Sequence, residues 1–323
     1  MKAVVVADNG VAVSELPKPT PGASQVLVRV RAAGLNRADL IMASGRRHGS
    51  AGGPGAVLGL EFAGDVEAVG SEVTSVKPGD RVMCSGNGGY AEYALADWGR
   101  VSPIPANNMG YELAATLPVA LQTMHDAVVS NGRLTAGETV LIQGASSGVG
   151  LMGLQIAKLK GARLVIGTST NPGRRQRLKE FGADLAIDTG EPNWSARVLE
   201  ATAGRGVDLI VDQVSGSVAN ENLRAAAVLG RIVNVGRLGG FKGEFDFDLH
   251  AMRRIDYIGV TFRTRTPEEV REIVRRMRAD LWSEIEAGRL RLPIDRVFAL
   301  DQAAAALAHM RANAHFGKIV LTV

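Results

Sequence analysis

The segment that most constrains the fold is a glycine-rich loop between an apolar run and a helical pattern. The apolar run covers 139–143, and the helix is expected over 148–160. The loop reads Gly144-Ala145-Ser146-Ser147-Gly148-Val149-Gly150. The first glycine permits a sharp turn, the second leaves space beside the backbone, and the third lets the helix pack closely on the strand. Because helix-start N–H groups and the positive end of the helix dipole meet at such a turn, the loop predicts a pyrophosphate site for a dinucleotide.

The chain around this loop alternates between strand and helix patterns. Further strands are expected at 163–167, 185–188, 207–211, 231–235 and 257–262, and helices at 174–181, 194–203 and 217–227. This rhythm predicts an α/β Rossmann fold, with a doubly wound parallel sheet.

The same loop also matches the nucleophile-elbow spelling, which would make Ser146 the nucleophile of a hydrolase. No HGGG-type motif precedes it, and the predicted sheet begins at the strand before the loop, so the dinucleotide interpretation is favoured.

The end of the second predicted strand distinguishes the two nicotinamide cofactors. A protein that binds NAD usually has Asp or Glu there. This chain has the hydroxyls of Thr168 and Ser169, followed by Arg174 and Arg175. Hydroxyls and a guanidinium bind a 2′-phosphate, so Thr168, Ser169 and Arg174 predict NADPH. Alternatively, the two arginines form a solvated helix start.

The first third of the chain contains short β patterns at 3–6, 25–32, 64–69, 81–84 and 89–95, which predict a small antiparallel barrel. A helical pattern, expected to form a helix pair, follows at 109–130. An amphipathic stretch at 267–287 precedes a last strand at 318–323 that we expect to rejoin the barrel. The predicted domains are 1–122, 123–262 and the returning segment 263–323.

Composition narrows the classes of protein. With 323 residues, 46% hydrophobic, the chain is long enough for two cores. A single cysteine, Cys84, excludes an intramolecular disulfide and a multi-cysteine zinc site. The net charge of +4 is concentrated on a helix where arginines alternate with glutamates, so nucleic-acid binding is not expected. No signal peptide or membrane span is evident, and we expect a cytoplasmic protein.

Four segments together resemble a known family: 33–40 (AGLNRADL), 59–66 (GLEFAGDV), 76–82 (VKPGDRV) and 317–321 (GKIVL). With the glycine-rich loop, the chain resembles the zinc-free, zeta-crystallin-like quinone oxidoreductases of the medium-chain dehydrogenase/reductase superfamily. The resemblance implies a GroES-like β-barrel catalytic domain, a homodimer, and NADPH-dependent reduction of a quinone or an activated C=C bond such as an enone or enal. Zinc-dependent relatives carry Cys where this chain has Asn36 and His where it has Leu60, so no metal is expected.

The resemblance also implies roles for single residues. Asn36 is expected to be catalytic, with Tyr90 and His48 as further candidates, and Thr123, Gly236 and Phe262 are expected to contact the cofactor. The alternatives are a turn residue for Asn36, packing for Tyr90 and Phe262, and a helix hydroxyl for Thr123. The tyrosine that many relatives carry after the asparagine segment is missing, so solvent, His48 or His125 would supply a proton. Such a chain could also be an NADPH-binding structural or nucleic-acid-associated protein with little turnover.

Overall fold

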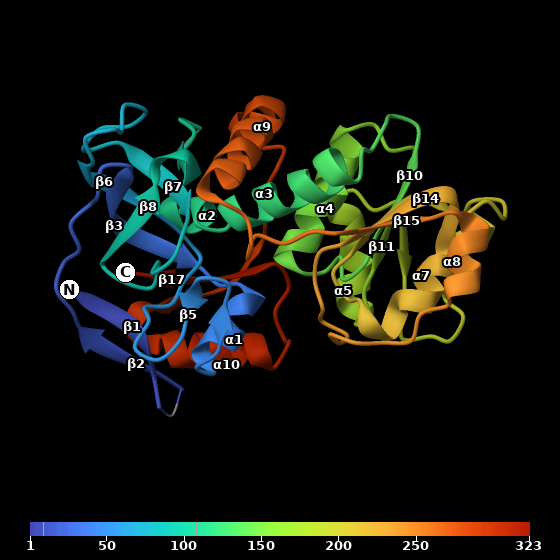
Figure 1. The fold of residues 1–323 in the computed structure, drawn as a ribbon, viewed down its shortest axis with the longest axis horizontal. Coiled ribbons are helices and arrows are strands. Elements are labelled where there is room, and N and C mark those ends of the chain that lie inside the picture. The colour runs from blue at the N-terminus through green and yellow to red at the C-terminus, as the bar shows by residue number, and fades with distance from the viewer. Residues whose placement is uncertain (9, 108) are drawn as a thin grey trace. The chain divides into compact units, whose positions relative to one another are not determined.

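The structure is a computed structural model that describes residues 1–8, 10–107 and 109–323. The chain forms two units with separate sheets (Figure 1). The first unit contains 1–122 and 262–323, and the second contains 123–261.

The second unit is built on a six-stranded parallel sheet. Its strands are β10 (Thr139–Ile142), β11 (Leu164–Thr168), β12 (Leu185–Ile187), β13 (Val207–Asp212), β14 (Ala226–Asn234) and β15 (Asp256–Gly259). They lie in the order β12-β11-β10-β13-β14-β15, and neighbours pair in parallel. The chain therefore starts at the centre of the sheet and winds outward in one direction and then in the other, which is the Rossmann topology. The predicted fold is confirmed.

Helices connect the strands of this sheet. They are α4 (Gly148–Leu159), α5 (Pro172–Arg177) with η3 (Leu178–Phe181), α6 (Ser195–Ala201), η4 (Gly216–Val218), α7 (Ala219–Ala225) and α8 (Phe247–Arg253). Buried Leu141, Ile166, Ile210 and Ile232, one from each central strand, form the core with apolar helix side chains. The helix predicted to 227 ends at Ala225, because the backbone at Ala226 is extended and begins β14.

The first unit contains a seven-stranded sheet. The order is β16 (Ile294–Ala299), β17 (Lys318–Thr322), β3 (Gln25–Gly34), β6 (Glu61–Val69), β7 (Arg81–Ser85) and β9 (Val101–Pro103), and β8 (Tyr93–Asp97) also pairs with β3. Two hairpins accompany it: β1 (Lys2–Ala7) with β2 (Gly10–Glu15), and β4 (Arg47–His48) with β5 (Ala51–Gly52). The pairs are antiparallel as predicted, except that β16 and β17 are parallel.

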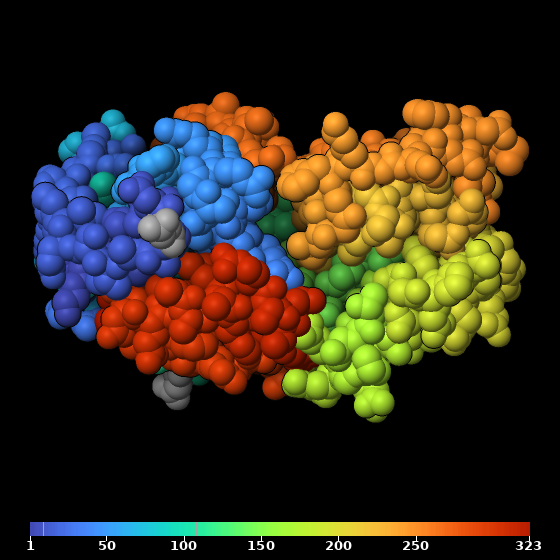
Figure 2. All heavy atoms as spheres, turned by 90° about the horizontal axis from the view of Figure 1, so that it is seen from below, coloured from blue at the N-terminus to red at the C-terminus, as the bar shows by residue number. Residues whose placement is uncertain are grey.

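Helices close this unit. They are α1 (Arg37–Ala43), η1 (Trp98–Arg100), α2 (Tyr111–Ala114), α9 (Pro267–Glu286), η5 (Leu300–Gln302) and α10 (Ala303–Arg311). The segment predicted as a helix pair at 109–130 contains two helices: α2 ends at Ala114, and α3 (Pro118–His125) starts at a proline. A π-helical turn, η2 (Asp126–Asn131), follows. Figure 2 shows the C-terminal segment packed against the N-terminal hairpin, where α10 contacts β2. Among the described residues, no helix is long and apolar enough to cross a membrane.

Candidate functional site

The glycine-rich loop joins β10 to α4. Ser147 caps the helix, since its Oγ accepts the Gly150 N–H at 3.0 Å. Gly144 has φ +66°, and a Cβ added at Gly150 would lie 2.6 Å from both the Ala145 Cα and the Gly144 oxygen. The loop and the first helical turn therefore touch backbone to backbone. Gly148 and Val149 occupy the first two helical positions, where N–H groups have no acceptor within the helix. The residues present fit a bound pyrophosphate.

A chain of buried hydrogen bonds holds the base of the loop. The Thr168 hydroxyl accepts the Gly144 N–H at 3.0 Å and donates to Gln143 Oε1 at 2.8 Å. Gln143 Nε2 donates to Asn222 Oδ1 at 2.7 Å, and Asn222 Nδ2 donates to Asp212 Oδ2 at 3.0 Å. Burial raises the pKa of the Asp212 carboxyl, and hydrogen bonds from the Ser215 and Val214 N–H groups and from Asn222 partly oppose that rise. Because Thr168 is buried and its one hydroxyl hydrogen goes to Gln143, this geometry does not support the phosphate contact predicted for Thr168.

Gln213 is a second support that sequence reasoning missed. Its Nε2 donates to the Gln143 oxygen at 2.9 Å, and its Oε1 accepts the Ser147 hydroxyl at 3.2 Å. Gln143 and Gln213 both follow the carboxyl end of a parallel strand. Ligands bind at that edge in doubly wound sheets, so the place of Gln213 directly after a strand end was the sequence signal for a role at this site.

The turn after β11 carries the residues predicted to select the cofactor. The Ser169 hydroxyl donates to Ser146 Oγ at 3.2 Å, so the second strand end meets the phosphate loop. Arg175 Nη1 donates to the Ser169 oxygen at 2.8 Å and to Asp188 Oδ2 at 2.6 Å. Asp188, which follows β12, is a carboxylate that sequence reasoning missed. Its charge is paired with that of Arg175. Ser169 and the half-buried Arg174 are therefore the residues suited to a 2′-phosphate.

Gly236 lies where the ends of β13 and β14 approach. A Cβ there would be 2.5 Å from the Gln213 oxygen, and the Gly236 N–H donates to the Asp212 oxygen at 3.1 Å. Thr123, the other cofactor contact predicted in this unit, is half-buried on α3.

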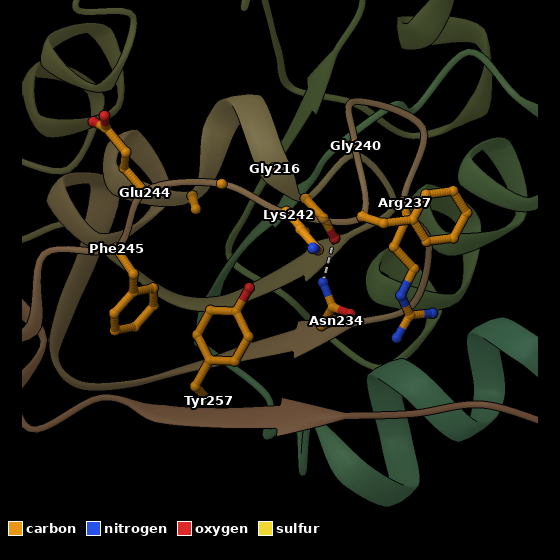
Figure 3. A pocket seen from close by; sticks show the side chains of 12 residues that line it. Gly216, Asn234, Arg237, Gly240, Lys242, Glu244, Phe245 and Tyr257 are labelled. Carbon is orange, nitrogen blue, oxygen red and sulfur yellow. Dashed lines mark hydrogen bonds between the residues drawn. The ribbon is translucent and has the colours of Figure 1, made fainter.

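A cavity of about 230 Å³ opens beside Gly236 on the same unit. Figure 3 shows the Tyr257 hydroxyl pointing into it near Asn234 and Lys242. Burial raises the pKa of Tyr257. Asn234 donates to the Ser215 hydroxyl, which donates to the Gly236 oxygen at 2.6 Å.

The first unit contains a buried polar cluster around Asn36. Asn36 precedes α1, and its backbone N–H donates to Asp39 Oδ2 at 2.7 Å. Its side chain turns toward two charged residues: Nδ2 donates to Glu61 Oε1 at 2.9 Å, and Oδ1 accepts from Lys318 Nζ at 3.1 Å. Glu61 and Lys318 were not predicted as site residues. Their segments, 59–66 and 317–321, carry the family resemblance, but no local pattern indicates that they meet.

Glu61 and Lys318 form a buried ion pair. The Lys318 ammonium donates to Glu61 Oε1 and to the Leu35 oxygen, the latter at 2.8 Å, and Glu61 Oε2 accepts the Val119 N–H at 2.9 Å. Lys318 is 3% exposed and Glu61 is fully buried. A Cβ at Gly34 would lie 2.8 Å from Glu61 Oε1, so the carboxylate packs on bare backbone.

Tyr90 and Asp39 adjoin this cluster. The Tyr90 hydroxyl donates to Asp39 Oδ2 at 2.6 Å, and both side chains are fully buried. Burial raises the pKa of Asp39 to about 7, opposed by hydrogen bonds from Tyr90 and from the Asn36 N–H. Burial also raises the pKa of Tyr90 well above its ordinary value. The Tyr90 hydroxyl therefore faces Asp39 rather than solvent, and its catalytic role stays a prediction.

The remaining predicted residues are placed as follows. His48 is half-buried in the small hairpin of β4 and β5, and its catalytic role stays a prediction. Phe262 begins the segment that returns to the first unit, and the Arg265 guanidinium lies 5.9 Å from its ring centroid.

A zinc ion does not fit the described site. Zinc is bound by Cys, His, Asp or Glu. The Asn36 amide is already hydrogen-bonded to Glu61 and Lys318, and Leu60 has an aliphatic side chain that cannot bind a metal. The Lys318 ammonium beside Glu61 would repel a metal cation. Burial raises the pKa of Cys84, which opposes a thiolate ligand. No group of three or more His, Cys, Asp or Glu suited to a metal occurs within 1–8, 10–107 and 109–323.

A Rossmann unit with a phosphate loop, joined to a β unit with a buried polar cluster, defines the class of nicotinamide-dependent oxidoreductases. Comparison with known proteins agrees with this class. Residues 22–106 match the alcohol dehydrogenase GroES-like domain, and residues 148–279 match the zinc-binding dehydrogenase family. The quinone oxidoreductase of Rattus norvegicus is 30% identical over 311 residues, which cover 95% of this chain and 92% of the relative. The chain belongs to the medium-chain dehydrogenase/reductase superfamily, and the predicted resemblance is confirmed.

Other relatives differ in length. The chain is 32% identical over 310 residues to the phthioceranic/hydroxyphthioceranic acid synthase of Mycobacterium tuberculosis; the match covers 94% of this chain but only 14% of that protein. Among solved structures, the quinone oxidoreductase of Pseudomonas syringae pv. tomato DC3000 is 28% identical with a TM-score of 0.88, covering 100% of this chain and 99% of the other. Mycobacterial Rv1454c complexed with NADPH is 27% identical with a TM-score of 0.88, and both chains are covered completely. This family argues against the hydrolase alternative for Ser146.

Proposed function

We propose that the chain is an NADPH-dependent, zinc-independent reductase that transfers a hydride to a quinone or to the activated C=C bond of an enone or enal. The observation that carries the proposal is the Asn36–Glu61–Lys318 cluster, in which an amide stands where the resemblance places a metal-ligand Cys and a buried ammonium lies beside that amide. Without a Lewis acid, alcohol oxidation is disfavoured, whereas reduction of an electron-poor acceptor remains feasible.

The cofactor half of the proposal rests on the second unit. NADPH, when bound, supplies the hydride. Gly148 and Val149 offer helix-start N–H groups to its pyrophosphate, and Ser169 with Arg174 binds the 2′-phosphate. The NADPH complex of a relative with a TM-score of 0.88 supports this assignment.

Asn36 is the residue that we assign to the acceptor. Its Nδ2 carries two hydrogens, of which one is donated to Glu61. The remaining N–H donates to the carbonyl oxygen of the quinone or enone and stabilises the negative charge that develops there. Solvent then supplies the proton that completes the hydroquinone or the saturated ketone.

The names of the relatives support both kinds of acceptor. Two quinone oxidoreductases and a CurK enoyl reductase, which is 25% identical with a TM-score of 0.87, share the fold. Stopped-flow oxidation of NADPH with a panel of simple quinones, enones and enals tests the proposal. We expect turnover with at least one class and a preference for NADPH over NADH. Tight binding of NADPH with no turnover across the panel would instead favour a structural role.

We also propose a homodimer formed through the edge strand β15. Among the described residues, seven of the eleven exposed large apolar side chains lie within 228–257. This apolar edge patch consists of Val228, Leu229, Leu238, Phe241, Phe247, Met252 and Tyr257. Apolar exposure of this kind beside unpaired strand edges is typical of an association surface.

A further inference from the structure

We propose that Lys318 is a positioning residue: together with Glu61 it locks the Asn36 amide in the one orientation that leaves an N–H for the acceptor oxygen. This inference rests on the proposed function, because it assigns the acceptor to Asn36. It adds a role for β17, the strand that Lys318 begins.

The two charges determine which way the amide points. Lys318 Nζ has only donors, and it lies 3.1 Å from Asn36 Oδ1. Glu61 Oε1 only accepts while ionised, and it lies 2.9 Å from Asn36 Nδ2. A flipped amide would face the ammonium with its N–H groups and the carboxylate with its oxygen. The ion pair therefore selects one of two otherwise similar orientations.

The ion pair is itself immobile, because three adjacent strands carry it. Lys318 begins β17, Glu61 begins β6, and β3 lies between these strands. Lys318 Nζ reaches the Leu35 oxygen just beyond β3 at 2.8 Å, and the Leu35 N–H donates to Ile319 at 2.9 Å. All three ammonium hydrogens thus have an acceptor: Leu35, Asn36 and Glu61. A lysine with every donor engaged holds its neighbours in fixed orientations.

The orientation leaves the second amide hydrogen only weakly held. Besides its bond to Glu61, Asn36 Nδ2 donates to the Gly34 oxygen at 3.5 Å, the outer limit of a hydrogen bond, and an acceptor oxygen would replace this long contact. Asn36 is 9% exposed, whereas Glu61 is completely buried. Asn36 is therefore the most exposed member of the cluster, and we place the acceptor oxygen at its amide.

Substitutions of Lys318 and Glu61 distinguish an effect on the orientation of the Asn36 amide from a loss of stability. Lys318→Met leaves Glu61 buried without its cation, so we expect a loss of both stability and turnover. The double variant Lys318→Met/Glu61→Gln removes both charges of the ion pair and should regain stability. We expect its kcat to stay roughly 100-fold below wild type while its NADPH affinity is unchanged, because the amide is no longer oriented. Recovery of kcat together with stability would overturn the proposal.

Two controls complete the experiment. Lys77→Met, at an exposed lysine in a turn of the same unit, should behave as wild type. Asn36→Ala should lower kcat as far as the double variant does, and adding Lys318→Met/Glu61→Gln to it should cost little more, since residues that act together are not additive. Full additivity of the two effects would contradict a shared role.

A readout without turnover keeps the proposal testable if the proposed function fails. In asparagine-labelled protein without cofactor, the Asn36 side-chain amide should give two separate, slowly exchanging proton signals by NMR, identified by their absence in Asn36→Ala. We expect these signals to shift and exchange faster in Lys318→Met/Glu61→Gln. If the signals stay unchanged, Lys318 does not orient the amide. If they change but no quinone or enone is reduced by wild type, the proposed function fails and the positioning role stands.

Discussion

At the scale of single residues, Asp39 shows how the buried cluster affects stability. Asp39 accepts from Tyr90 and from the Asn36 N–H through one oxygen, Oδ2, whereas Oδ1 is buried with no hydrogen-bond partner. Burial raises the pKa of Asp39 to about 7 from an ordinary value of 3.8. The folded chain therefore holds a proton on Asp39 at pH values where the unfolded chain has lost it.

This difference predicts a pH dependence of stability. Because the unfolded state binds fewer protons between pH 4 and pH 7, Asp39 makes the free energy of unfolding fall as pH rises through that window. Asp39→Asn cannot ionise, so its stability relative to wild type should increase by about 3 kcal/mol between pH 5 and pH 8. Urea unfolding at both pH values measures this, with Asp301→Asn at an exposed site as the control. Parallel pH profiles for wild type and Asp39→Asn would contradict it.

A second prediction at this scale concerns cofactor choice. Arg174→Ala should weaken NADPH binding by about 10- to 100-fold and leave NADH binding nearly unchanged, because only NADPH carries the 2′-phosphate. Arg177→Ala is the matched control on the same helix, since Arg177 pairs with Glu180. Fluorescence titration measures the affinity of both variants for NADPH and for NADH. An equal loss for NADPH and NADH would show that Arg174 does not bind the 2′-phosphate.

Residues near one another in sequence could be predicted, and residues joined by tertiary contact could not. The loop glycines and the Ser169–Arg174 turn act locally, so their spacing indicates their role. The Lys318–Glu61 contact joins positions 257 residues apart. The cofactor contact of Thr168 stays a prediction: its hydroxyl faces Gln143, and no local pattern shows which way a strand-end hydroxyl points.

At the scale of elements, the contact between the loop and α4 is the critical one. A Cβ at Gly150 would lie 2.6 Å from backbone atoms that cannot move without distorting the loop. A Cβ at Gly153, one turn later, would lie 2.9 Å from Met124 Sδ, the end of a flexible side chain. The two glycines thus share a helix but differ in what surrounds them.

Gly150→Ala should therefore cost about 1 to 3 kcal/mol of stability and weaken NADPH binding at least roughly tenfold. Gly153→Ala should be close to neutral, because Met124 can shift and alanine favours the helix. Thermal unfolding and NADPH titration of both variants measure the difference. Equal behaviour of the two variants would show that the loop does not depend on close packing at Gly150.

Element patterns gave the topology of the second unit more completely than that of the first. Strand and helix alternate there, and right-handed crossovers leave few arrangements. In the first unit the parallel pairing of β16 with β17 depends on where a distant segment returns, and two-residue strands such as β4 and β5 carry no periodicity. Pro118, which begins α3, is a local signal for the boundary between the two predicted helices.

At the scale of the whole molecule, the apolar edge patch predicts association. Val228 is 53% exposed on β14 and Met252 is 67% exposed on α8, two elements that pack together. Val228→Glu/Met252→Glu should shift the chain from dimer to monomer, because charges at the centre of an apolar interface are costly to desolvate. The fold should be retained, since both side chains are exposed. Val13→Glu, at an exposed residue of β2, serves as the control. Analytical ultracentrifugation would contradict the prediction if wild type were monomeric or if the double variant stayed dimeric.

The proposed reaction is reduction by NADPH without a metal. The most direct test is the rate of NADPH oxidation with the best quinone or enone acceptor, measured before and after exhaustive chelation, with bound metal quantified in the same samples. We predict equal rates in both samples, because the Lys318 ammonium beside Asn36 and Glu61 would repel a metal cation. Loss of activity on chelation, with recovery when Zn²⁺ is returned, would contradict the claim.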